Sequence, residues 1–294
     1  GMGRDLYEIY PAFRQVLNSA PVDFDLKKLC FDGPEDQLND TRYTQPCMVA
    51  FAAGVTALLR EAGITPDYAA GLSLGEYSAL QCAGVFDAKT AISLVAFRGQ
   101  AMADAVQGRP CGMAAVLGMD RDALKAVCAE ASDAGVVECT NFNCPGQTVI
   151  SGDAAAVDKA GELAKAAGAK RVLPLKVSGP FHTSLMAPAG DALREKFQSV
   201  DFGAMEIPVL FNCLGDLKGE ADTIPNLLEQ QVQSSVYLED TIRRLGELGV
   251  DTVVEIGPGR TLSGFVKKTV KGIKCYPVET AEELQAAIAA LRGE

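Results

Sequence analysis

The sequence predicts a protein of the α/β class, in which helices pack against a largely parallel sheet. Segments with helical periodicity alternate with short apolar segments along most of the chain, and this alternation is typical of the class. One short apolar segment runs directly into Gly71-Leu72-Ser73-Leu74-Gly75 and then into a helical pattern. Between about Arg109 and Lys176 the order of the elements changes, which indicates an inserted subdomain.

The first third of the chain predicts several helices and one buried strand. Residues 4–18 form a helical segment, and residues 46–62 form a long helix that is apolar all round and therefore buried. Residues 68–72 are predicted to be a short buried strand that ends at Ser73, and residues 76–83 start the next helix. A strand, a sharp turn and a helix in this order form the nucleophile elbow of an α/β-hydrolase-like core.

Residues 109–177 are predicted to form the inserted small subdomain. Its strands and helices alternate as βαββαβ, over residues 112–117, 121–131, 136–138, 147–150, 154–167 and 171–177. This order is that of a ferredoxin-like unit, a compact two-layer module. Residues 1–108 and 178–294 are expected to form the large subdomain, with further buried strands of a short parallel sheet at 208–212 and 251–256.

Composition excludes several classes of function. The chain has 294 residues, of which 48% are hydrophobic, so it can bury a large core. No uninterrupted apolar run reaches the roughly 18 residues of a membrane span, and no signal peptide is evident, so we expect a soluble cytoplasmic protein. The net charge of −11 disfavours nucleic acid and anionic membranes as partners. Nine cysteines without a C-x-x-C pair, together with one histidine, predict free thiols and no metal site.

The pentapeptide Gly71 to Gly75 offers a candidate nucleophile, Ser73. A serine hydroxyl needs a base within hydrogen-bond reach, and the only imidazole in the chain belongs to His182. The amide of Leu74, at the start of a helix, points where an oxyanion would form. On residue types alone, the pentapeptide is as compatible with a plain strand-to-helix turn, and a solitary histidine is more often a surface or core residue than a catalyst.

Six short segments carry a resemblance to a known family. In chain order they are Thr44-Gln45-Pro46, Gly71 to Ala79 (GLSLGEYSA), Phe97 to Met102, Asn141 to Gly152 (N-x-N-x-P-x-Q followed by VISG), Gly179 to His182, and Glu255 to Gly259. Together they resemble the malonyl-CoA:acyl-carrier-protein transacylases of fatty acid synthesis and the related acyltransferase domains of polyketide synthases. The segments span nearly the whole chain.

The resemblance implies a reaction with two half-steps. Ser73 would attack the thioester of malonyl-CoA, and His182 would take its proton and later deprotonate the phosphopantetheine thiol of acyl carrier protein. A main-chain carbonyl at Gln231 would orient the histidine, although without the resemblance Gln231 is equally a helix-end glutamine. Malonyl-CoA and acyl carrier protein are then the partners. No permanently bound cofactor is implied, and we expect a monomer.

Three further residues would bind the substrate. Arg98 would hold the malonyl carboxylate in a bidentate salt bridge, because a guanidinium is planar and stays charged. Without the resemblance, an arginine after an apolar helical run is more often a solvated charge. Phe181 resembles the family position at which a bulky ring leaves little room for an α-methyl branch, so malonyl is expected over methylmalonyl. Asn143, within the asparagine motif, is assigned to substrate binding in the same way.

The sequence departs from the family pattern at two places. Leu72 stands where the family usually has a histidine before its nucleophile. Relatives also begin with a strand that ends in a Gly-Gln-Gly turn, whose glutamine supplies a second oxyanion donor, whereas this sequence begins with a helical segment. We therefore expect the first strand to be missing here. Loss of one oxyanion donor typically costs on the order of 10²–10³ in turnover, so weak activity is one expected consequence.

Two other functions stay open at this point. A serine acyl hydrolase or thioesterase would place an acid between serine and histidine, and the candidates are Asp87, Asp104, Asp120, Asp133 and Asp153, none of them in a convincing strand-end turn. The other is an N-terminally truncated, weakly active module that binds the carrier protein. Acidic carrier proteins would need clustered cations on this acidic chain, with Arg243, Arg244, Lys267, Lys268 and Lys271 as candidates.

Overall fold

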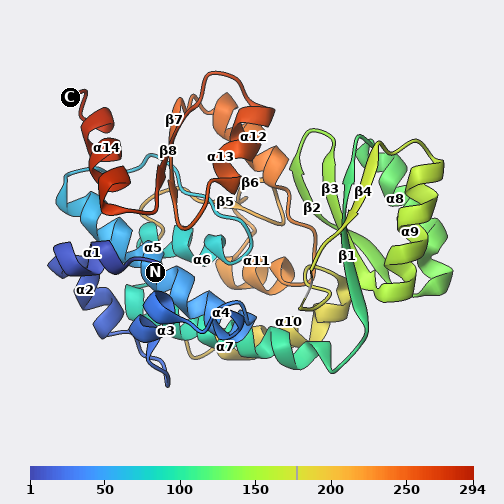
Figure 1. Ribbon diagram of the computed structural model, residues 1–294, viewed down its shortest axis with the longest axis horizontal. Helices are drawn as coiled ribbons and strands as arrows, with labels where there is room; N and C mark the ends of the chain where they lie inside the picture. Colours follow the sequence, from blue (N-terminus) through green and yellow to red (C-terminus); the bar gives the residue numbers. More distant parts are fainter. Residues whose placement is uncertain (177) are drawn as a thin grey trace. The chain divides into compact units, whose positions relative to one another are not determined.

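The computed structural model describes residues 1–176 and 178–294 and shows a mixed α/β fold (Figure 1). The chain divides into two compact units. The first unit contains Gly1–Gly99, Asp201–Leu210 and Leu245–Glu294, and the second contains Gln100–Val200 and Phe211–Arg244. The mixture of helices and strands predicted from the sequence is confirmed, whereas the largely parallel sheet is not.

The first unit is rich in helices. Its helices are α1 (Arg4–Ile9), α2 (Pro11–Asn18), α3 (Leu26–Asp32), α4 (Glu35–Leu38), α5 (Thr41–Glu61), α6 (Gly75–Cys82), the start of α7 (Ala88–Val106), α13 (Thr261–Thr269) and α14 (Ala281–Leu291). Two strands, β7 (Thr252–Ile256) and β8 (Lys274–Val278), pair in parallel. Helix α5 begins at Thr41, five residues before the predicted start, because the Asp40 side chain caps it by accepting a hydrogen bond from the Arg42 N–H.

The parallel sheet predicted for this unit is smaller than expected. Residues 68–72 were predicted to form a strand, but they contribute only an isolated parallel bridge between Ala69 and Val209. Two hydrogen bonds make this bridge, from the Ala69 N–H to the Pro208 carbonyl and from the Leu210 N–H to the Ala69 carbonyl, both 3.0 Å long. A strand is defined by continued pairing, and the chain turns into the elbow at Gly71 before more pairs can form.

Other strands also differ from the prediction. The segment 208–212 shortens to β5 (Leu210–Phe211), which forms a two-stranded sheet with the unpredicted β6 (Asp216–Leu217). Strand β8 was not among the strands predicted from the sequence. It contains Pro277, which lacks an N–H and so weakens the strand pattern, although a proline is tolerated where a strand has a neighbour on one side only.

The second unit contains a four-stranded antiparallel sheet with strand order β2-β3-β1-β4. The elements of this part are β1 (Cys111–Leu117), α8 (Arg121–Glu130), the 3-10 helix η1 (Ala131–Ala134), β2 (Val137–Cys144), β3 (Gln147–Asp153), α9 (Ala154–Ala166) and β4 (Arg171–Pro174). Helices α8 and α9 cover one face of the sheet (Figure 1), where a continuous apolar cluster includes Leu124, Val127, Phe142, Ile150 and Val157. Sequence and structure agree on the order of these elements.

Strand β2 is longer than predicted. The prediction covered residues 136–138, whereas the strand continues to Cys144 through Asn141 and Asn143. Polar asparagines are typical of loops, but here the segment bulges between Cys139 and Asn141 and again between Phe142 and Cys144 while it stays paired with β3. Strand β4 ends at Pro174, and position 177 of the predicted strand lies outside the described residues.

The rest of the second unit is helical. It contains the 3-10 helix η2 (Ser184–Met186), α10 (Ala187–Phe197), α11 (Ile224–Gln231) and most of α12 (Leu238–Glu247). Within the described part of the chain, no helix is long and apolar enough to cross a membrane. No disulfide joins any of the nine cysteines, all of which are described.

Candidate active site

Ser73 occupies a tight turn between the Ala69 bridge and α6. Its φ is +54°, in the left-handed region that side chains other than glycine rarely adopt. Two backbone hydrogen bonds close the turn, from the Gly75 N–H to the Leu72 carbonyl (3.0 Å) and from the Glu76 N–H to the Ser73 carbonyl (3.1 Å). Backbone strain at a residue other than glycine is often found at functional sites.

The two glycines of the pentapeptide are not equivalent. A Cβ built on Gly71 would lie 2.0 Å from the carbonyl carbon of Gly75 and 2.6 Å from the Glu76 nitrogen. A Cβ built on Gly75 meets nothing within 4 Å. Gly71 is therefore required by the close approach of backbone to backbone, and Gly75 is not.

Leu74 directly precedes α6 and occupies its N-cap position. No acceptor in the described part of the chain takes a hydrogen bond from the Leu74 N–H. A backbone N–H at a helix start, unengaged by the protein, is the kind of group that can stabilise a developing oxyanion. This geometry fits the role predicted for Leu74.

The buried guanidinium of Arg98 lies next to Ser73. Its Nη2 donates a hydrogen bond to Ser73 Oγ at 3.3 Å, and its Nη1 donates to Gln45 Oε1 at 2.8 Å. The guanidinium carbon is 5.3 Å from the ring centroid of Tyr77, a cation–π distance. Burial lowers the pKa of Arg98, while the nearby Tyr77 and Glu76 oppose that shift. The sequence pattern favoured a solvated arginine, but Arg98 is 0% exposed.

Gln45 is a site residue to which sequence reasoning gave no role. It is 3% exposed, and its Nε2 donates to Thr41 Oγ1 at 2.8 Å, one turn earlier on α5. The available signal was the segment Thr44-Gln45-Pro46, which the family resemblance included without a role. A buried glutamine in an otherwise apolar helix is itself a polar group that requires partners.

His182 lies in a turn of the second unit, again with positive φ, at +63°. The side chain is 6% exposed, and its Nδ1 is 2.7 Å from the main-chain carbonyl oxygen of Gln231. Because a carbonyl can only accept, Nδ1 carries the proton and Nε2 of the neutral ring keeps a lone pair. The His182 N–H also donates to the Val232 carbonyl at 3.1 Å, so both ring and backbone are held by the end of α11.

The side chain of Gln231 has a separate partner. It is fully buried, and its Nε2 donates to Asn212 Oδ1 at 3.2 Å. The Asn212 carbonyl accepts from the Tyr237 N–H at 2.9 Å, which connects β5 to the segment after α11. The sequence predicted Asn212 only as the end of a strand. The one sequence feature that could have indicated a role in the site was a single polar residue after an apolar run.

The remaining predicted substrate residues also lie in the second unit. Asn143 is 7% exposed, and its Oδ1 is buried without a hydrogen-bond partner among the described residues. A buried acceptor in this state is available to a ligand donor. Phe181 is half-buried and immediately precedes His182.

The structure groups the predicted residues into two sets. Ser73, Leu74 and Arg98 belong to the first unit, where Ser73 and Arg98 are in hydrogen-bond contact. The other set belongs to the second unit and consists of Asn143, Phe181, His182 and Gln231. The pairing of Ser73 with His182 stays a prediction.

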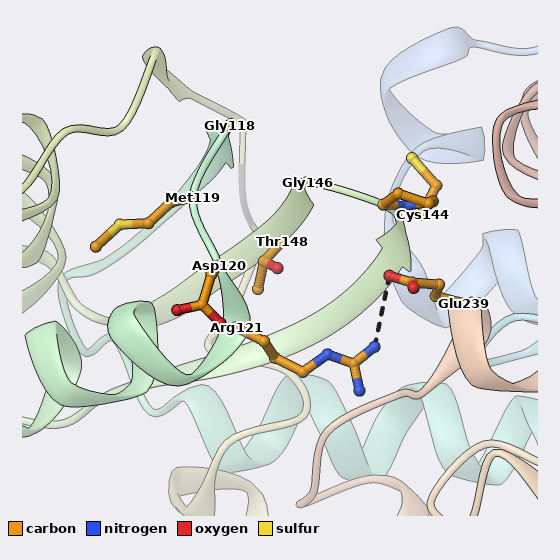
Figure 2. Close-up of a pocket in the computed structure, with 9 residues that line it drawn as sticks. Gly118, Met119, Asp120, Arg121, Cys144, Gly146, Thr148 and Glu239 are labelled. Atoms are coloured by element: carbon orange, nitrogen blue, oxygen red, sulfur yellow. Dashed lines mark ion pairs between the residues drawn. The ribbon is translucent and has the colours of Figure 1, made fainter.

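A hollow of about 430 Å³ in the second unit is a different feature (Figure 2). It lies among the ends of β1 and β2 and the start of α8, and Figure 2 shows Arg121 directed toward Glu239, with an N···O distance of 3.6 Å. None of the predicted site residues lines it. Within residues 1–176 and 178–294, no group of three His, Cys, Asp or Glu residues is placed to hold a metal ion.

A strained serine between a short strand segment and a helix is typical of α/β proteins that carry an acyl group on serine. Residues 1–289 match the family described as "Acyl transferase domain". The chain belongs to this acyl transferase family.

Individual relatives agree with that assignment. The chain is 43% identical over 297 residues to the malonyl CoA-acyl carrier protein transacylase of Bacillus subtilis (strain 168), an alignment that covers 100% of this chain and 94% of that protein. The crystal structure of the Clostridium perfringens transacylase superposes with a TM-score of 0.95 at 36% identity, covering 100% of this chain and 93% of that one. A malonyl-transacylase solved with a type II polyketide-synthase acyl-carrier protein gives a TM-score of 0.94 at 39% identity, covering 100% and 95%.

Proposed function

We propose that this protein transfers a malonyl group from malonyl-CoA to the phosphopantetheine thiol of an acyl carrier protein, through a malonyl ester of Ser73. The hydrogen bond of 3.3 Å between Arg98 Nη2 and Ser73 Oγ carries the proposal. This contact places a cation beside the nucleophile. An acyl group with a carboxylate at its far end can be bound to Ser73 through its carbonyl carbon and pair with Arg98 through that carboxylate. The named relatives, one of them bound to a carrier protein, support the same reaction.

In the first half-reaction, Ser73 Oγ attacks the thioester carbonyl of malonyl-CoA, and His182 Nε2 accepts the hydroxyl proton. The tetrahedral oxyanion is stabilised by the N–H of Leu74. When the carbon–sulfur bond breaks, the imidazolium returns the proton to the leaving thiolate, and the malonyl-serine ester remains. The Nδ1 hydrogen bond to the Gln231 carbonyl keeps the ring in the tautomer that this step requires.

The second half-reaction repeats the chemistry with a different thiol. His182 deprotonates the phosphopantetheine thiol of the carrier protein, and the thiolate attacks the ester carbonyl. The serine oxygen leaves and recovers the proton from the imidazolium, so atoms and charge balance over the cycle. Coenzyme A and phosphopantetheine act as substrates, and the proposal includes no resident cofactor.

Acyl selection follows from Arg98 and Phe181, whereas Asn143 binds the pantetheine chain. The guanidinium pairs with the malonyl carboxylate, and a neutral acyl group would leave this buried charge without that partner. The ring of Phe181 limits the room for an α-methyl branch, so malonyl is preferred to methylmalonyl. Asn143 Oδ1 accepts a hydrogen bond from an amide N–H of the pantetheine chain, which supplies a partner that the described residues do not.

The acyl-hydrolase alternative receives less support from the geometry. A hydrolase of the α/β type holds its histidine with a carboxylate, whereas the partner of His182 Nδ1 is a main-chain carbonyl. The candidate acids have other roles: Asp120 caps α8 and Asp153 pairs with Arg109. A further pair joins Asp133 to Lys159.

We also propose the finer organisation of the chain. The strand order β2-β3-β1-β4 with α8 and α9 on one face supports a ferredoxin-like subdomain over residues 109–177, and the elbow supports an α/β-hydrolase-like core in the rest. All the proposed site residues come from one chain, so a monomer suffices for the reaction.

The carrier protein is proposed to dock on the lysines of the α13 region. Arg243 and Arg244 are engaged in ion pairs, with Glu239 and Asp216 respectively. Lys267, Lys268 and Lys271 are exposed, and none forms an ion pair within the described residues. Cations without internal partners are better placed to attract an acidic partner.

Intact-mass measurement after exposure to malonyl-CoA tests the function. The wild-type chain is expected to gain one malonyl group, which carrier-protein thiol then removes faster than water does. Ser73→Ala should abolish the adduct and Arg98→Ala should weaken it, while Ser93→Ala, an exposed serine on α7, serves as the matched control. An adduct that persists in Ser73→Ala, or that only water removes, contradicts the proposal.

A further inference from the structure

The turn that carries His182 is strained. A residue other than glycine keeps a φ of +63° only where its surroundings hold it there. Three contacts come from the turn itself and from the end of α11: the His182 N–H and Nδ1 bind the carbonyls of Val232 and Gln231, and Thr183 Oγ1 donates to the Pro180 carbonyl. A fourth contact comes from the sheet.

Glu138 of β2 supplies that fourth contact, two residues beyond the histidine. The Ser184 N–H donates to Glu138 Oε2 at 2.9 Å and to Oε1 at 3.3 Å. Ser184 begins η2, which runs directly into α10, and backbone N–H groups at a helix start have no partner within the helix. A hydrogen bond from an N–H to a carboxylate is stronger than one to a neutral acceptor. The carboxylate therefore fixes the point at which the chain leaves the His182 turn.

Strand β2 gives Glu138 a rigid base. Glu138 pairs with Ser151 of β3 inside the four-stranded sheet. Its neighbours Val137 and Cys139 belong to the apolar cluster beneath α8 and α9. Because side chains alternate along a strand, the Glu138 carboxylate lies on the opposite face of the sheet.

The same strand also holds the segment that follows α11. The Val236 N–H donates to the Thr140 carbonyl at 2.8 Å, and the Val236 carbonyl accepts from the Phe142 N–H at 2.9 Å. The carbonyls that bind His182 lie only a few residues earlier, at the end of α11. Strand β2 therefore supports the histidine from both sides, through Glu138 and through the segment at position 236.

We propose that Glu138 is a positioning residue for His182: its carboxylate binds the Ser184 N–H and thereby keeps the imidazole in the orientation that proton transfer requires. This inference rests on the proposed function, in which His182 is the base, and adds a residue to it. Glu138 acts through the turn and not on the substrate. Its loss should therefore slow the proton-transfer steps and leave the binding of malonyl-CoA largely intact.

Three variants separate this hydrogen bond from other effects of the side chain. Glu138→Ala removes the acceptor, whereas Glu138→Gln removes the charge but keeps an oxygen that can accept from the Ser184 N–H. Ser184→Pro removes the donor. A proline suits this position because Ser184 begins η2 and because Thr183 before it is extended, with φ −113° and ψ 168°.

The first readout is the rate at which malonyl-CoA acylates Ser73, followed by quenched-flow intact mass. For Glu138→Ala we expect the maximal rate to fall about 10-fold and the half-saturating malonyl-CoA concentration to change less than about 3-fold, the lower end for a hydrogen bond to a charged group because this contact is exposed. Glu138→Gln should recover most of the lost rate. Ser184→Pro should match Glu138→Ala, and the double variant should be no slower, since both changes remove the same bond.

The second readout is the imidazole itself. The chain has one histidine, so isotope labelling of the ring nitrogens gives one pair of NMR signals, whose shifts report which nitrogen carries the proton. At alkaline pH, where an imidazole is neutral, we expect the proton to be fixed on Nδ1 in the wild type and in Glu138→Gln. In Glu138→Ala the signals should move toward the average of the two tautomers.

Glu162→Ala is the matched control, since it removes the same charge from an exposed position of α9 and should change neither readout. A folded Glu138→Ala protein with the wild-type rate or with unchanged ring signals overturns the inference. Glu138→Gln as slow as Glu138→Ala, or losses that add in the double variant, overturn it as well.

If Glu138→Ala does not fold, Ser184→Pro decides the matter, because a wild-type rate or wild-type ring signals in that variant overturn the inference. If Ser184→Pro does not fold, the comparison of Glu138→Ala with Glu138→Gln decides it. A wild-type chain that forms no malonyl adduct instead contradicts the proposed function, and the ring signals then still test how Glu138 positions His182.

Discussion

Replacing Gly71 with alanine should damage the elbow far more than the same change at Gly75. Sequence alone treats the two glycines of the pentapeptide alike. In the structure, a Cβ at Gly71 would lie 2.0 Å from the Gly75 carbonyl carbon and 2.1 Å from its oxygen, whereas ordinary contacts begin at 3.4 Å. The obstructing atoms are backbone, so the turn itself must move by more than about 1 Å to admit the methyl group.

The expected size of the effect follows from that overlap. Overpacking typically costs 1–3 kcal/mol, and a clash with backbone belongs near the upper end, so we expect a loss of about 3 kcal/mol for Gly71→Ala. With about 2–4 °C per kcal/mol for a unit of this size, the melting temperature should fall by about 6–12 °C. A displacement of about 1 Å at Ser73 should also reduce acylation about 100-fold.

Gly75→Ala provides the comparison. It begins α6 and has open space around its Cα, so alanine should be neutral or stabilise by up to about 1 kcal/mol. The chain has no tryptophan, so melting is best followed by circular dichroism and tyrosine fluorescence. The steric reasoning is wrong if Gly71→Ala melts within about 2 °C of wild type, or if Gly75→Ala loses as much stability as Gly71→Ala.

Two further predictions concern the histidine and the carrier protein. Gln231→Ala keeps the main-chain carbonyl that holds His182, so the rate of malonyl transfer should fall less than about 10-fold. His182→Ala removes the base and should lower the rate about 10³-fold or more. Equal losses in the two variants would show that the glutamine side chain matters more than its carbonyl. Lys267→Glu should raise the carrier-protein KM several-fold at low salt and leave the malonyl-CoA half-reaction unchanged, and Arg243→Glu, at a residue already paired with Glu239, should change neither. An Arg243→Glu effect as large as that of Lys267→Glu would place docking elsewhere.

Local features of the fold were predictable because short stretches of sequence determine them. The order β1-α8-β2-β3-α9-β4 follows from periodicities of 2 and 3.6 residues, and the turn at Ser73 follows from Gly71. The extension of β2 through Asn141 and Asn143 was not predictable, because polar residues in a bulged strand read as a loop. Strand β8 was missed for a similar reason, since Pro277 weakens the local signal.

By itself, the sequence determined the α/β class, the candidate nucleophile Ser73 and the choice of His182 as the only available imidazole. Tertiary structure alone decided that Arg98 is buried against Gln45, and it places the Gln231 carbonyl, which only the family resemblance had suggested, at the histidine ring. These pairs are separated by 53 and 49 positions along the chain. Periodicity and turn chemistry act over a few residues, whereas such contacts depend on how whole helices pack, as Gly99 shows by admitting α7 to the first turn of α5.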